Sequence, residues 1–173
     1  MYRSARRSDF RWLGFLLPVV NVLFLLQVGR QDCPDVAKIY GNLGNVYNRQ
    51  GQYERALEYY QKALEIDIKV SGQDHPDVAT SLMNVGNVLQ AMGKYEETLV
   101  QHQKSLGIKI RVVGSDHPDV AMSKYNIASL KKTQGDLEGA RRLFLECEQI
   151  YLKAYGPDHS ETVDAARQAS RCV

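Results

Sequence analysis

A repeat of 42 residues constrains this chain more than any other feature of its sequence. The motif Asp-x-Pro-Asp-Val-Ala begins at Asp32, Asp74 and Asp116, and a weaker copy begins at Asp158. The pattern predicts three units, residues 32–73, 74–115 and 116–157, and a terminal helix in residues 158–173. Self-similarity at such a period indicates a solenoid, in which each unit packs on its neighbours to bury its apolar faces.

Each unit is predicted to form two antiparallel helices. In the first unit Val36, Tyr40, Leu43 and Tyr47 recur at intervals of three or four residues, which is one face of a helix. Gly51 ends this stretch, where a left-handed cap is expected, and a second amphipathic stretch follows. Proline fits the first turn of a helix, and a preceding aspartate can accept its free amides, so the Asp that opens each motif is predicted to cap the first helix.

Small and large residues alternate between the paired helices. Gly44, Gly86 and Ala128 occupy one position of the first helices, and the large Tyr60 and Phe144 occupy one position of the second helices. We expect this alternation to let the two helices of a unit approach closely.

Seven residues of the first unit stand at the spacing of the tetratricopeptide signature, and the 42-residue period resembles the repeats of kinesin light chains. The resemblance implies an all-α, right-handed solenoid of antiparallel helical hairpins, here behind an apolar N-terminal helix. It also implies a protein-interaction scaffold similar to the cargo-binding part of a kinesin light chain, since no motor-binding coiled coil is recognisable. The signature residues are Tyr40, Leu43, Gly44, Tyr47, Ala56, Tyr60 and Ala63.

In proteins of this type the first helix of each unit lines a concave groove that holds peptides. By position, the resemblance assigns the groove to residues of three first helices. An asparagine amide both donates and accepts, which suits it to bind a peptide backbone, and we hypothesise that Asn45 and Asn87 do so. The alternative is inherited repeat sequence with solvated amides. The expected groove residues are Lys38, Asn45, Asn48, Arg49, Met83, Asn84, Asn87, Gln90, Tyr125, Asn126, Ser129 and Lys132.

Chaperone-binding members of the family bind a terminal carboxylate with lysines, an arginine and two asparagines. Asn45 and Asn84 match the asparagine positions, but Gly41, Met122 and Asn126 occupy the cationic ones. Without those charges a carboxylate would be unpaired. The sequence therefore disfavours an adaptor for a chaperone tail.

Charge and motifs argue against several other classes of function. The net charge of +2 divides into +4 over residues 1–30 and −2 over the rest, so the repeats lack a basic surface for nucleic acid. His75, His117 and His159 fall one repeat apart, too far from one another to bind one metal ion. No catalytic motif is recognisable. We expect no enzyme activity, no cofactor and no metal, and a protein or peptide partner. An enzyme of an unrecognised type stays open as a further alternative.

The N-terminal segment has an apolar stretch, residues 12–28, after four arginines. This pattern is typical of a signal-anchor or a cleaved signal peptide, and a further possibility is an extension without a targeting role. An anchor would associate the chain with a membrane and place the repeats outside the cytosol. The function would then be that of an extracytoplasmic assembly scaffold, whereas kinesin-like cargo binding requires cytoplasmic repeats.

Overall fold

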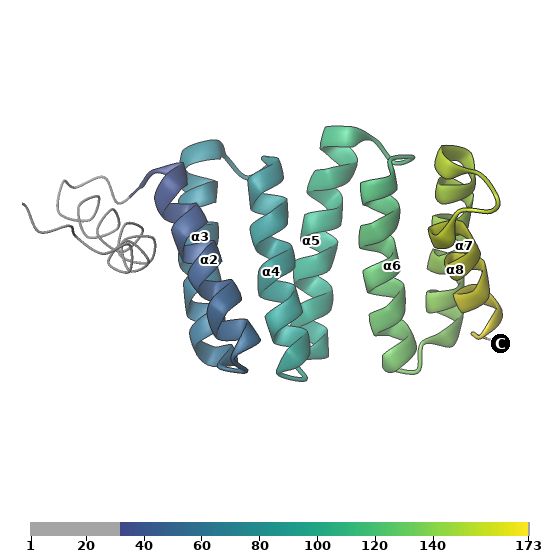
Figure 1. Ribbon diagram of the computed structural model, residues 1–173, viewed down its shortest axis with the longest axis horizontal. Helices are drawn as coiled ribbons and strands as arrows, with labels where there is room; N and C mark the ends of the chain where they lie inside the picture. The colour runs from purple at the N-terminus through teal and green to yellow at the C-terminus, as the bar shows by residue number, and fades with distance from the viewer. Residues whose placement is uncertain (1–31, 173) are drawn as a thin grey trace, which may run out of the picture.

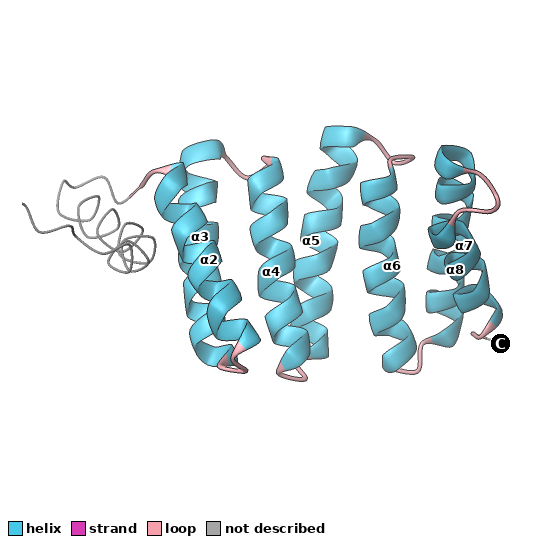
Figure 2. Ribbon diagram, in the orientation of Figure 1, coloured by secondary structure: helices cyan, strands magenta, loops and turns pink. Residues whose placement is uncertain are grey.

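The computed structural model describes residues 32–172, which form helices and no strand (Figures 1 and 2). The helices succeed one another as antiparallel hairpins along one long axis, with α2 and α3 at one end and α8 at the other (Figure 1). This is the all-α solenoid that the sequence predicts. The helices are α2 (Pro34–Arg49), α3 (Tyr53–Ser71), α4 (Pro76–Ala91), α5 (Tyr95–Val113), α6 (Pro118–Thr133), α7 (Leu137–Tyr155) and α8 (Ser160–Ser170).

The turns fall at the glycines that the sequence indicates. Gly51 follows the last residues of α2 with a φ of 72°, and Gly72 ends α3 with a φ of 84°. Only glycine adopts these left-handed conformations without a steric penalty. The equivalent glycines of the later repeats do the same, which keeps each pair of helices antiparallel.

The first helices begin differently from the prediction. The capping residues are His75 and His117, whose Nδ1 atoms accept the amides of Asp77 and Asp119 at 3.2 Å. The prediction that the motif's opening Asp caps the helix is wrong, because that residue lies one position too early and its side chain turns away.

The opening aspartates instead form ion pairs with the ends of the second helices. Asp32 pairs with Lys69, Asp74 pairs with Arg111 at 2.5 Å, and Asp116 pairs with Lys153 at 2.6 Å. All of these side chains are exposed, so solvent screens each pair and its contribution to stability is small.

The alternation of small and large residues is confirmed. A Cβ added to Gly44 would lie 2.6 Å from the Tyr60 ring, and one added to Gly86 would lie 2.7 Å from the His102 ring. Ala128 and Phe144 lie in one buried cluster of the third repeat. The first and second helices of a repeat therefore approach closely at these positions.

Different side chains fill the core along the solenoid. Ala56 and Tyr60 of α3 pack against Val85, Val88 and Leu89 of α4 and join the first repeat to the second. The residues of α5 equivalent to Ala56, Tyr60 and Ala63 are polar and buried. They are Thr98, His102 and Ser105.

The N-terminal predictions lie outside the described residues, including the apolar helix and the association of residues 12–28 with a membrane. Within residues 32–172, no helix is both long enough and apolar enough to span a bilayer.

Candidate peptide-binding groove

The expected groove residues lie on α2, α4 and α6, and every one of them is at least partly exposed. The structure divides them among three surroundings. Lys38, Asn45 and Asn84 line a cavity between α2 and α4. Met83 contacts a lysine from α5, and Tyr125 and Lys132 contact the terminal helix. The others lie along the same first helices.

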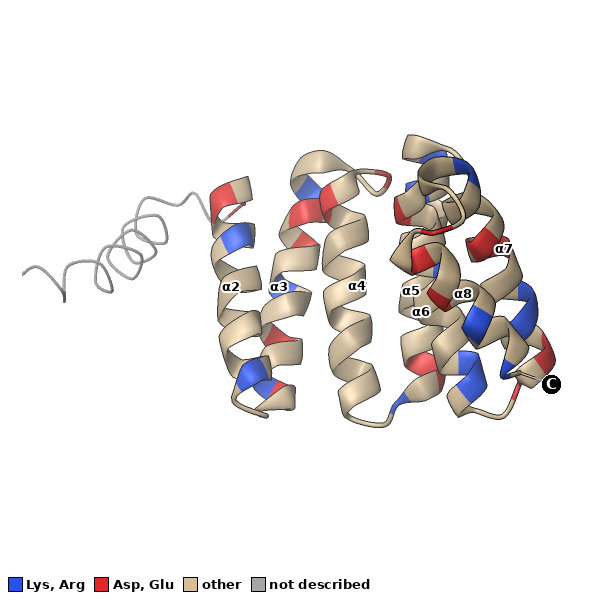
Figure 3. Ribbon diagram, turned by 45° about the vertical axis from the view of Figure 1, so that its right-hand side comes forward, with Lys and Arg blue, Asp and Glu red and all other residues tan. Residues whose placement is uncertain are grey.

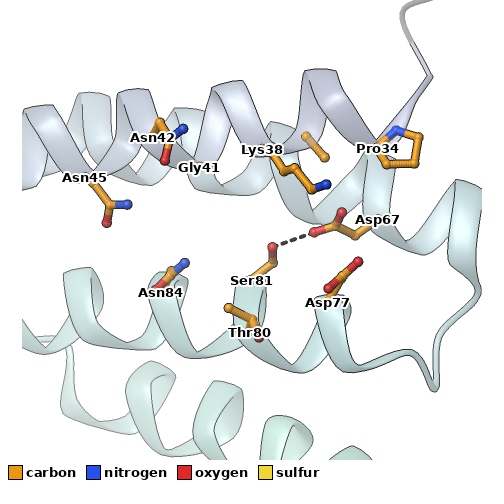
Figure 4. A pocket seen from close by; sticks show the side chains of 11 residues that line it. Pro34, Lys38, Gly41, Asn42, Asn45, Asp67, Asp77, Thr80, Ser81 and Asn84 are labelled. Carbon is orange, nitrogen blue, oxygen red and sulfur yellow. Dashed lines mark hydrogen bonds between the residues drawn. The ribbon is translucent and has the colours of Figure 1, made fainter.

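The cavity at the first junction has a volume of about 370 Å³ and opens to solvent. Figure 4 shows its two walls: Lys38, Gly41, Asn42 and Asn45 on one helix face Asn84 on the other. The side chain of Asp67 enters from α3 beneath them. Of these residues Lys38, Asn45 and Asn84 belong to the groove expected from the sequence, whereas Gly41, Asn42 and Asp67 do not.

A hydrogen bond from the core fixes the orientation of Asn45. The Tyr60 hydroxyl donates to Asn45 Oδ1 at 2.7 Å. Because this bond uses the carbonyl oxygen of the amide, the exposed NH₂ group is left to face the groove. Asn45 is therefore arranged to donate to an acceptor, such as a peptide carbonyl.

Asp67 is the most unusual group in this cavity. It is 9% exposed, and its Oδ2 accepts a hydrogen bond of 2.6 Å from Ser81 Oγ of α4. Burial raises the pKa of the Asp67 carboxyl and the Ser81 hydrogen bond opposes this. The nearby Asp77 raises the pKa further, and His75 lowers it. Its sequence signal is a charged residue in register with Tyr60 and Ala63 on the buried face of α3.

The second junction carries a lysine at the position of Asp67. Lys109 of α5 donates to Ser123 Oγ at 2.9 Å and contacts Met83 Sδ at 3.1 Å. Burial lowers the pKa of the Lys109 ammonium, and Asp119 opposes this shift. Lys109 and Asp119 thus have opposite charges, whereas their equivalents in the first junction, Asp67 and Asp77, are both acidic.

The terminal helix covers the predicted groove residues of the third repeat. Tyr125 donates to Asp164 of α8 at 2.5 Å, and Lys132 donates to Gln168 of α8 at 3.1 Å. Burial and the bond to Asp164 raise the pKa of the Tyr125 hydroxyl to about 12. The hydrogen-bonding groups of Tyr125 and Lys132 are thus used for contacts within the solenoid.

Charge is unevenly distributed along the first helices. In Figure 3 α4 is almost free of charged residues, with Asp77 in its first turn as its one charged residue. By contrast, α6 carries Lys124, Lys131 and Lys132. Among residues 32–172, no group of three or more His, Cys, Asp or Glu is arranged to hold a metal ion.

Solved structures share this fold at low sequence identity. A Podosopora anserina protein assigned as a kinesin light chain, with nearly identical tetratricopeptide-like repeats, aligns at a TM-score of 0.70 and 20% identity over 82% of this chain and 67% of that one. BtubC from P. vanneervenii aligns at 0.66 and 22% identity, over 95% and 73% of the respective chains. PcrH, in complex with the chaperone binding region of PopD, aligns at 0.61 and 18% identity, over 81% and 92%.

Sequence comparison identifies the family directly. No curated protein shows a significant sequence match to this chain. The family profile for the tetratricopeptide repeat, however, matches residues 35–97 and 77–153, which together cover more than half of the chain. With the helical hairpins and the kinesin-light-chain-like neighbours, this match shows that the chain belongs to the tetratricopeptide repeat family.

Proposed function

We propose that the chain is a non-catalytic interaction scaffold that binds a peptide segment of another protein across its first helices. The observation that carries the proposal is the cavity between α2 and α4, where Asn45 and Asn84 face each other from adjacent repeats. An extended peptide has carbonyl and N–H groups along both of its edges. The asparagine side chains on the two opposite walls can form hydrogen bonds with both edges. Binding of this kind is independent of most of the peptide's sequence.

The solved neighbours support this mode of binding by analogy. The PcrH structure holds the chaperone binding region of PopD, so that protein of the same fold binds a segment of a partner. The kinesin-light-chain-like neighbour supports an adaptor role for this chain. Here the first junction is the favoured location, because the third repeat uses Tyr125 and Lys132 to bind α8.

The proposal is tested by selecting peptides from a displayed random library on the purified full chain. The affinity of the recovered peptides is then measured for a variant carrying Asn45→Ala and Asn84→Ala. We expect this variant to bind at least about tenfold more weakly, since it loses two hydrogen-bonding groups of roughly 1 kcal/mol each.

The matched control is Gln61→Ala, which removes an amide from an exposed position of α3 outside the cavity and is expected to keep the affinity. Circular dichroism verifies that the helical content is unchanged. Equal affinity of the double variant and the unaltered chain would remove the first junction from the binding site.

A further inference from the structure

The cavity of the first junction contains a buried carboxylate without a cation. Asp67 is 9% exposed and accepts one hydrogen bond, from Ser81, while its other carboxylate oxygen accepts none from the described residues. Figure 4 shows the carboxylate between α2 and α4, beside Ser81 and Lys38. A buried charge without an opposite charge is costly, and such groups are usually paired.

Neither of the two nearby basic side chains, Lys38 and His75, forms an ion pair with Asp67. Asp77, the second carboxylate of the lining, has the His75 imidazole 3.5 Å away, and His75 Nδ1 accepts the Asp77 backbone amide at 3.2 Å and forms no ion pair with Asp67. Lys38 of α2 extends its ammonium group toward Asp67 (Figure 4), but among the described residues no ion pair joins it to either carboxylate. The lining therefore has a net negative charge, with Asp67 as its most buried charged residue.

Asp77 alone would indicate little, because an acid in the first turn recurs in every repeat and is favoured there by the helix dipole. Asp67 has no such role. An asparagine could accept the same hydrogen bond from Ser81 without a buried charge. A purely structural role therefore does not account for a carboxylate at this position.

The second junction shows which charge pairs with the acid in the first turn of a first helix. There, Lys109 supplies an ammonium group to the serine equivalent to Ser81 and lies near Asp119, the equivalent of Asp77. The protein itself thus provides a cation beside the recurring acid of the second junction. At the first junction the equivalent residue is an acid, and the space above it is an open cavity.

We infer that the first junction binds a lysine or arginine side chain of the peptide ligand, placed on Asp67 and Asp77 with the peptide backbone between Asn45 and Asn84. This inference rests on the proposed groove function and specifies its ligand. The negative charge of this lining is opposite to the positive charge of a site that binds a terminal carboxylate. Lys38 then competes with the ligand's cation for the same carboxylates and does not contact the ligand favourably.

The test uses four pools of nonapeptides with blocked ends, randomised except at the fifth residue, which is arginine, lysine, citrulline or glutamate. Citrulline has the shape of arginine without its charge. Retention of each pool is measured on the immobilised full chain and on its variants. We expect the arginine and lysine pools to be retained about tenfold more than the citrulline and glutamate pools, as a charge-assisted hydrogen bond implies.

Two substitutions on α3 assign this preference to the cavity. Asp67→Asn keeps the acceptor for Ser81 and is expected to abolish the preference for a cation. Glu65→Gln removes the same charge from an exposed position of the same helix and is expected to leave the preference intact. Lys38→Met is expected to increase retention of the arginine pool by removing the competing cation.

Equal retention of all four pools, above the level of the Asn45→Ala, Asn84→Ala variant, would overturn the inference and leave the groove function standing. Preference for the glutamate pool, or a cation preference that persists in Asp67→Asn, would also overturn it. If no pool is retained above that variant, the proposed function fails and this inference fails with it.

Discussion

At the first repeat junction the Tyr60 hydroxyl donates to Asn45, whereas at the second junction the equivalent His102 leaves its Nε2 buried and without a hydrogen-bond partner. The same glycine position, Gly44 or Gly86, receives either ring. The fold therefore requires a ring of suitable size at this position, and it tolerates a loss of hydrogen bonding. The missing hydrogen bond lowers the stability of the second junction.

The same two junctions differ in the charge that faces the groove. Asp67 accepts from Ser81 at the first, and Lys109 donates to Ser123 at the second. A serine can donate or accept, so one scaffold accommodates both signs. This difference is the basis of our proposal that repeats equivalent in fold differ in binding, with the first junction as the ligand site.

The largest expected effect is on stability, and it differs between substitutions at Gly44, which contacts Tyr60, and at Gly86, which contacts His102. Gly44→Leu should lower the free energy of unfolding by about 2 to 3 kcal/mol, because it displaces Tyr60 and breaks its bond to Asn45. Gly86→Leu should cost roughly 1 kcal/mol less, since His102 has no such bond to lose. Urea unfolding measures both.

Gly41→Leu is the control for these substitutions, because a Cβ at Gly41 meets no atom within 4 Å. Equal losses for Gly44→Leu and Gly86→Leu would contradict the difference between the junctions.

Acid should weaken the second junction through His102. Burial lowers the pKa of this imidazole, and Lys109 lowers it further, so the folded state binds a proton less readily than the unfolded state. The contribution of His102 to stability is therefore complete above the unfolded value of about 6.5 and is lost as the pH falls below it. Between pH 7 and pH 5 we expect the free energy of unfolding to fall by no more than about 2 kcal/mol through this residue, the limit set by protonation of the unfolded imidazole.

His102→Tyr is the comparison for this pH dependence, since it should copy the first junction by donating to Asn87, the equivalent of Asn45. Unfolding at both pH values is measured for both chains, whose other titrating groups are the same. An identical pH dependence in the two chains would show that His102 is not the group responsible.

A smaller effect is expected from Asp67→Asn, with the opposite sign. The pKa of Asp67 is raised, so the folded state binds its proton more tightly than the unfolded state. The contribution of Asp67 to stability is therefore most favourable below its ordinary pKa and is lost as the pH rises through the raised value. At pH 7 the variant should be more stable by about 1 kcal/mol.

Thermal unfolding at pH 7 checks this gain, with Glu65→Gln expected to lie within about 0.5 kcal/mol of the unaltered chain. A destabilised Asp67→Asn variant would mean that the carboxylate has a structural role after all.

The sequence predicted the features that depend on period and local geometry. The repeat, the hairpins, the turn at Gly51 and the approach of Gly44 to Tyr60 all follow from spacing and from residue size. It did not predict the cap at His75, because an aspartate and a histidine at adjacent positions both can accept an amide and only the backbone path decides between them.

The charged floor of the groove was missed for a different reason. The resemblance assigns the groove to first helices, whereas Asp67 and Lys109 belong to second helices and reach the groove from beneath. The cover that α8 gives to Tyr125 depends on contacts 39 residues apart in sequence, which spacing alone does not specify.

The most direct test of the account is a nuclear magnetic resonance titration of the ¹⁵N-labelled full chain with the arginine pool, followed at the asparagine side-chain amides. The account predicts that Asn45 and Asn84 shift, while Asn126, at the second junction, does not, and that Asp67→Asn suppresses the shifts. Shifts centred on Asn126, or equal shifts at all of these asparagines, would contradict the assignment of binding to the first junction.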